Sequence, residues 1–178
     1  MTFDPNLLRE VTFLDIEASA LDGGYPIEIG WATVDIPGQT LREVESFLIC
    51  PTPAWLGCAD GWSEVSARIH GITQGELLRD GMSAEEAMDR LDSAFAGRVV
   101  FSDSPKDQEW LLRLYRGGAS HERSLPFTRK DVATVFERHD TDEMRIHVAQ
   151  KMRSSRTRTH RAAEDAREWA ELFLHSRR

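Results

Sequence analysis

The stretch VTFLDIEASAL, residues 11–21, places two carboxylates inside what otherwise has the composition of a buried strand. Its apolar residues are β-branched or aromatic and fill consecutive positions, which is typical of a central strand covered on both faces. Asp15 and Glu17 are separated by one residue and therefore point to the same face, whereas Leu14 and Ile16 point to the other. Unpaired acids in such a strand are costly. The chain must fold so that this cost is offset.

Two explanations of these acids are open. They could be incidental polar residues on a solvated strand face. Alternatively, a divalent cation compensates their charge, because two hard oxygen donors on one face suit Mg²⁺ or Mn²⁺. The apolar flanks favour the cation, since a strand covered on both sides has no solvated face.

The order of sequence patterns predicts one α/β domain over residues 1–178. Strands are expected at residues 11–17, 27–31 and about 41–49, with short connections typical of an antiparallel meander. Helices and strands then alternate. Capping-box pairs predict helix starts at Thr73 and Ser83, and further elements are expected at residues 98–102, 104–115, 125–133, 134–139 and 161–175. This succession predicts a mixed five-stranded sheet flanked by helices.

Composition excludes some partners. The net charge of −8 argues against a protein that coats nucleic acid by bulk charge. No apolar run is long enough to span a bilayer, and the first residues lack the pattern of a signal peptide, so we expect a cytoplasmic protein with no membrane partner. Cys50 and Cys58 have no CxxC partners, which disfavours a disulfide framework or a zinc site.

The positive charge is concentrated late in the chain, in the segment QKMRSSRTRTHR. No acid separates its five basic residues, which are Lys151, Arg153, Arg156, Arg158 and Arg161. Such a run is either a solvated helix face or loop, or a contact for an anionic partner.

Two later segments carry acids at helix starts. Asp107 lies three residues after Ser104 and could be the carboxylate of a capping box. However, apolar residues follow it at three and four positions, which places Asp107 on the inward face of its helix. His160 directly precedes the last helix, and Asp165 lies in its second turn. Each of these features is ordinary when taken alone.

In this order, the segments resemble the DEDDh 3′-to-5′ exonucleases. This superfamily includes ribonuclease T, oligoribonuclease and the proofreading subunit of bacterial DNA polymerase III, and has a ribonuclease H-like fold. FLDIEAS matches the first motif, ARIHGITQGEL contains the central HGIT stretch, and HRAAEDA, residues 160–166, matches the third motif, HxAxxDA, in full. The second motif, an acid opening the helix after the fourth strand, falls on Asp107. The resemblance runs from about residue 12 to residue 173.

The chain departs from the family at two places. Ala18 follows the first motif where the family usually has threonine, so only a backbone contact with the terminal nucleotide is implied. The second motif reads SDSPKD instead of HNxxFD, with Asp103 and Lys106 in the altered positions. Asp103 therefore competes with Asp107 as the candidate ligand, and the inward face favours Asp107.

The resemblance implies a two-metal phosphodiesterase that uses Mg²⁺ or Mn²⁺. Asp15 would bridge both cations, Glu17 and Asp165 would complete the first site, and Asp107 would serve the second. His160 would take a proton from the attacking water. The substrate would be the 3′ end of single-stranded DNA or RNA, and the product a nucleoside 5′-monophosphate.

The substrate contacts implied in the same way are Ala18, His70, Arg158 and Arg161, with the basic run guiding phosphates toward the acidic centre. A homodimer is expected by analogy with several members. The departures also motivate an alternative function, a catalytically weakened module that binds nucleic acid or a partner on the same fold. A structural domain with incidental acids would need the motifs to occur in this order by chance.

Overall fold

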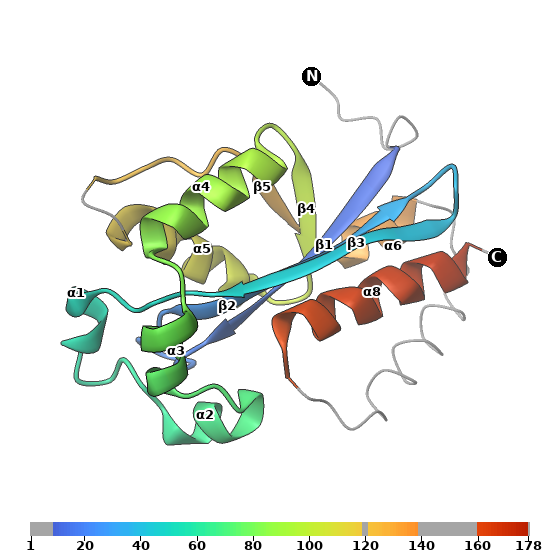
Figure 1. The fold of residues 1–178 in the computed structure, drawn as a ribbon. Coiled ribbons are helices and arrows are strands. Elements are labelled where there is room, and N and C mark those ends of the chain that lie inside the picture. The colour runs from blue at the N-terminus through green and yellow to red at the C-terminus, as the bar shows by residue number, and fades with distance from the viewer. Residues whose placement is uncertain (1–8, 119–120, 139–159, 178) are drawn as a thin grey trace.

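The computed structural model describes residues 9–118, 121–138 and 160–177, and its centre is a five-stranded sheet in the order β3-β2-β1-β4-β5 (Figure 1). The first three strands form an antiparallel meander, β1 (Glu10–Ala18), β2 (Pro26–Asp35) and β3 (Thr40–Leu48). Two shorter strands, β4 (Val99–Ser102) and β5 (Thr128–Asp131), continue the sheet in parallel with β1. The predicted mixed sheet is thereby confirmed.

Helices cover both faces of the sheet and one end of it (Figure 1). The long helices α4 (Ala84–Phe95) and α5 (Pro105–Gly117) cover one face, and α6 (Ala133–Arg138) and α8 (Ala162–Ser176) the other. Three short helices lie beyond the strand ends: α1 (Pro53–Leu56), α2 (Glu64–His70) and α3 (Gln74–Asp80). The sequence patterns predicted the positions of the longer helices but not α1 or α2.

Side chains of β1 alternate between two hydrophobic cores. Leu14 and Ile16 belong to the core under α4 and α5, whereas Val11 and Phe13 belong to the core under α8. The acids of β1 continue the second row, so they lie on the face that α8 covers. The expectation of a strand buried on both faces is confirmed.

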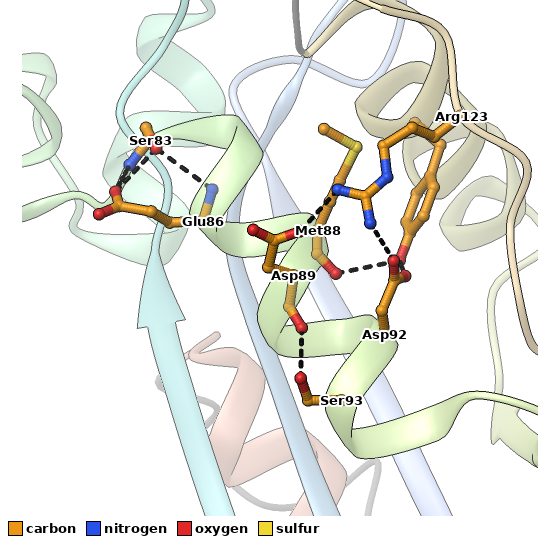
Figure 2. Close-up of polar contacts among 8 residues, drawn as sticks. Ser83, Glu86, Met88, Asp89, Asp92, Ser93 and Arg123 are labelled. Carbon is orange, nitrogen blue, oxygen red and sulfur yellow. Dashed lines mark hydrogen bonds and ion pairs between the residues drawn. The ribbon is translucent and has the colours of Figure 1, made fainter.

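A hydrogen-bonded start defines α4. The Ser83 hydroxyl accepts from the backbone amide of Glu86 at 3.2 Å, and the Glu86 carboxylate accepts from the Ser83 amide at 2.9 Å (Figure 2). This is the capping box that the sequence predicted. Farther along α4, Asp89 and Asp92 both accept hydrogen bonds from Arg123, which fastens the connection between α5 and β5 to this helix (Figure 2).

The start of α8 lies against the backbone of β2. A methyl group added to Gly30 would come within 2.3 Å of the Ala163 nitrogen and 2.4 Å of the Ala162 carbonyl carbon. Gly30 is also the β2 residue paired with Asp15 of β1. The glycine therefore lets the helix start come close to the sheet beside the predicted catalytic acids.

We expect Gly30→Ala to lower the free energy of unfolding by about 1–3 kcal/mol, because the added methyl group must displace the backbone of α8. Urea denaturation measures the change. Gly75→Ala in α3 is the matched control, since a methyl group there meets no atom within 4 Å, and it should leave stability unchanged or raise it by up to about 1 kcal/mol. Equal effects of the two substitutions would contradict this account of Gly30.

Candidate functional site

The topology brings the predicted catalytic residues to one edge of the sheet. Asp15 and Glu17 lie toward the carboxyl end of β1, and Asp107 lies in the first turn of α5, directly after β4. Because β1 and β4 are parallel, their carboxyl ends meet at the same edge. The start of α8 brings His160 and Asp165 to the same place.

Glu17, His160 and Asp165 form the tightest group. One ligand atom from each lies within 4.8 Å of the other two. Asp165 is buried, with 6% of its surface exposed, and the other two are half-buried. One candidate ligand atom from β1, one from α8 and one from the residue before its cap are therefore close enough together to contact a single cation.

Burial, and then repulsion between neighbouring carboxylates, raises the pKa values of Asp15 and Glu17. Burial raises the pKa of Asp15 well above its usual range, and the charges of Asp107, Glu17 and Asp165 raise it further. The pKa of Glu17 is raised to about 8, first by burial and then by Asp165. In the absence of a cation, these carboxylates resist being ionised together.

Asp107 has the feature expected of a ligand without its metal. Only 1% of its surface is exposed, and its Oδ2 atom is buried without a hydrogen-bond partner. Burial raises its pKa to about 7, opposed by a hydrogen bond from the Ser102 side chain. A buried oxygen without a partner is costly, and a cation would remove the cost. The donor set of carboxylate oxygens fits Mg²⁺ or Mn²⁺.

Asp103, the competing candidate, is exposed. Its charge still contributes to the raised pKa of both Asp15 and Asp107, so it lies near the site. Its solvent exposure lets water stabilise its charge, whereas Asp107 has no such compensation. The burial pattern therefore favours Asp107 as the ligand.

Sequence reasoning missed one charged residue of the site, Glu28 of β2. It is 1% exposed, and its carboxylate accepts from Nε and Nη2 of Arg161, both at 3.0 Å, and from the Ala162 amide at 3.1 Å. A signal was present in the sequence, because IEIG places an acid between apolar residues, as FLDIEAS does.

A cleft of about 570 Å³ opens beside the acids. Glu17, Ala18, His70 and His160 contribute to its wall. The remaining lining is largely apolar and includes three side chains that are more than half exposed, namely Leu21, Val65 and Ile69. A volume in the range of about 300–1,000 Å³ with exposed apolar walls is typical of a small-molecule site.

His70 lies in the wall of this cleft, with its Nε2 atom buried. The residue is 5% exposed, and Nδ1 accepts from the Ile72 amide at 3.0 Å. Burial lowers its pKa, so the neutral ring carries its proton on Nε2, which is buried without a partner. Of the other predicted substrate contacts, Ala18 also lines the cleft, Arg161 is bound to Glu28, and Arg158 lies outside the described residues, as does most of the basic run.

Comparison with known proteins gives matches at the level of structure. Neither a protein-family model nor a curated protein sequence matches the chain. The nuclease domain of 3′hExo, a DEDDh family member solved with rAMP, is 13% identical with a TM-score of 0.66, and the match covers 95% of this chain and 92% of that one.

A second solved structure has a backbone fold similar to that of this chain. Exonuclease I from E. coli, in complex with a dT13 oligonucleotide, is 15% identical with a TM-score of 0.67; the match covers 94% of this chain but 41% of that one. These likenesses show that the chain has the ribonuclease H-like fold of the DEDDh exonucleases, as its motifs predicted.

We expect the metal-free protein to lose stability as pH rises from about 5 to 8. Glu17 and Asp107 have raised pKa values in the folded state, so the folded protein binds more protons than the unfolded chain across this window, and the free energy of unfolding falls with pH. Thermal melting in EDTA measures this as a fall of several degrees.

Added Mg²⁺ should counteract this fall, because the cation binds the ionised carboxylates. The variant Glu17→Gln/Asp107→Asn should show a flatter dependence in EDTA. A wild-type melting temperature that rises over the same window would contradict the electrostatic account of the site.

Proposed function

We propose that this chain is a metal-dependent 3′-to-5′ exonuclease that hydrolyses single-stranded DNA or RNA and releases nucleoside 5′-monophosphates. The observation that carries the proposal is the convergence of four buried or half-buried acids with raised pKa values or close neighbours of like charge, namely Asp15, Glu17, Asp107 and Asp165. Such a cluster of carboxylates lowers the stability of the fold. It is, however, the arrangement that two cations need in order to bind a phosphodiester.

The acids can hold two divalent cations. Asp15, whose pKa is raised by the charges of both Asp107 and Glu17, would serve both cations, Glu17 and Asp165 would complete the first site, and Asp107 would serve the second. When bound, such cations polarise the phosphodiester and lower the pKa of a coordinated water. Mg²⁺ and Mn²⁺ are the ions that this oxygen-rich set favours.

His160 is the proposed general base. Its ring lies in the group formed with Glu17 and Asp165 and also lines the cleft. A water between these residues would lose its proton to the imidazole as its oxygen attacks phosphorus. The phosphorus–O3′ bond then breaks, and the departing 3′-oxygen takes a proton from solvent.

The cleft is the proposed site of the 3′-terminal nucleotide. Its apolar wall offers Leu21, Val65 and Ile69 to a base, and His70 lies in the same wall. The backbone at Ala18 would contact the 3′ end. The solved complexes with rAMP and dT13 support both nucleic acids as candidates.

Other expectations on partners remain predictions. No helix in the described ranges is long and apolar enough to cross a membrane. A homodimer, a cytoplasmic location and a substrate contact through Arg161 or the basic run are proposals that await direct measurement.

The main test uses a 5′-labelled single-stranded oligonucleotide with Mg²⁺ or Mn²⁺. We expect a ladder that shortens from the 3′ end, accompanied by nucleoside 5′-monophosphates identified by chromatography. Asp15→Asn should lower kcat by at least about 10²-fold, because the cations contribute several kcal/mol to the transition state. Glu109→Gln, an exposed acid on α5 that pairs with Lys106, is the control and should remain active.

Chelation separates this proposal from a weakened binding module on the same fold. In EDTA, an exonuclease loses all cleavage, and oligonucleotide binding weakens with it. Equal binding with and without cation, together with no cleavage under any condition, would favour the module instead. Parallel assays on DNA, RNA and dinucleotides would identify the preferred substrate.

A further prediction separates Asp107 from Asp103. Asp107→Asn should reduce kcat at least about 10²-fold, since its buried oxygen is the proposed ligand. Asp103→Asn should retain most of the activity, because Asp103 is exposed. Mn²⁺ titration by calorimetry should show the same ranking. The reverse ranking would assign the second site to Asp103.

A further inference from the structure

The first turn of α8 has no capping side chain of its own. The residue at the cap position, Arg161, makes no side-chain capping hydrogen bond. The Ala162 amide instead donates at 3.1 Å to Glu28, which comes from β2. A carboxylate at a helix start also interacts favourably with the helix dipole. Glu28 therefore caps α8 from a strand 134 residues away in sequence.

The same carboxylate holds the Arg161 guanidinium in a two-bond fork. Nε and Nη2 each donate to one Glu28 oxygen at 3.0 Å. Such a fork fixes direction as well as distance. With the amide of Ala162, three donors from two consecutive residues meet one buried carboxylate, so the path of the chain entering α8 is closely determined.

This arrangement links the two halves of the first metal site. Glu28 is the β2 residue paired with Glu17 of β1. On the helix, Arg161 directly follows His160, and its carbonyl accepts from the Asp165 amide at 3.0 Å. The ion pair of Glu28 with Arg161 therefore joins the strand pairing that positions Glu17 to the start of α8, which positions His160 and Asp165.

We propose that Glu28 and Arg161 are positioning residues of the candidate active site, which hold His160 and Asp165 at ligand distance from Glu17. The proposal rests on the proposed function for the identity of the site. Neither residue lines the cleft beside the acids. Their role is to keep the helix start in place against the mutual repulsion of the acids.

The first test uses conservative variants of the full chain. Arg161→Lys keeps the charge but loses the fork, and Glu28→Gln keeps an acceptor for Ala162 but loses the charge. In both we expect Mn²⁺ affinity, measured by calorimetry, to fall about 10–100-fold, the size typical of residues that support metal ligands. The kcat should fall more than KM rises, because neither substituted side chain lines the cleft.

A matched pair elsewhere controls for lost stability. Arg123 bonds Asp89 and Asp92 on α4, on the opposite face of the sheet (Figure 2). Arg123→Lys and Asp92→Asn should lower the melting temperature but leave Mn²⁺ affinity and kcat unchanged. A general loss of stability and a loss of positioning are thereby distinguished.

The variant Glu28→Gln/Arg161→Met provides the decisive comparison, because it removes both charges while glutamine keeps an acceptor for the Ala162 amide. Removing both charges of an ion pair leaves no unpaired charge at the buried position 28, so much of the stability lost in the single variants is recovered. We expect the melting temperature to return toward wild type while Mn²⁺ affinity and kcat stay low. If Mn²⁺ affinity and kcat recover together with the melting temperature, the pair is merely structural and the inference is overturned.

Failure of the inference differs from failure of the proposed function. Wild-type protein that binds Mn²⁺ and cleaves, together with single variants that do both equally well, would overturn the positioning role alone. Wild-type protein that neither binds Mn²⁺ nor cleaves would overturn the proposed function, and the positioning role with it.

Discussion

The contact between the start of α8 and strand β2 is the interaction on which the rest of the site depends. Gly30 leaves room for the helix backbone, and Glu28 holds the helix start through Arg161 and Ala162. Both come from the strand paired with β1. The last helix in the sequence is thereby fixed to the first two strands of the sheet. Asp165 of this helix, and His160 just before it, meet the acids of β1.

This contact opposes a strong electrostatic cost. Burial and then neighbouring carboxylates raise the pKa values of Asp15 and Glu17, and Asp107 retains a buried oxygen without a partner. The two hydrophobic cores supply the compensating stability, because they bury β1 on both faces and hold α5 and α8 in place. Sites that give up stability in this way are commonly functional.

The sequence predicted those elements whose residue patterns are long and missed those whose patterns are short. The strands of the meander, the capping box of α4 and the apolar stripe of α8 are repeated local patterns, and the structure has all of them. The short helices α1 and α2 were not predicted, because four to seven residues carry too little periodicity. Glu28 was missed because its role depends on a partner far away in the chain.

By itself, the sequence determined which residues can bind a cation or accept a proton, and which of them share one face of a strand. Asp15 and Glu17 point the same way because the side-chain period of a strand is two, a property of the local backbone. Only the tertiary structure decided that Asp107, His160 and Asp165 join them. That decision required parallel pairing of β1 with β4 and docking of α8 on β2, and such contacts between distant segments are set by packing of the whole domain rather than by any local pattern.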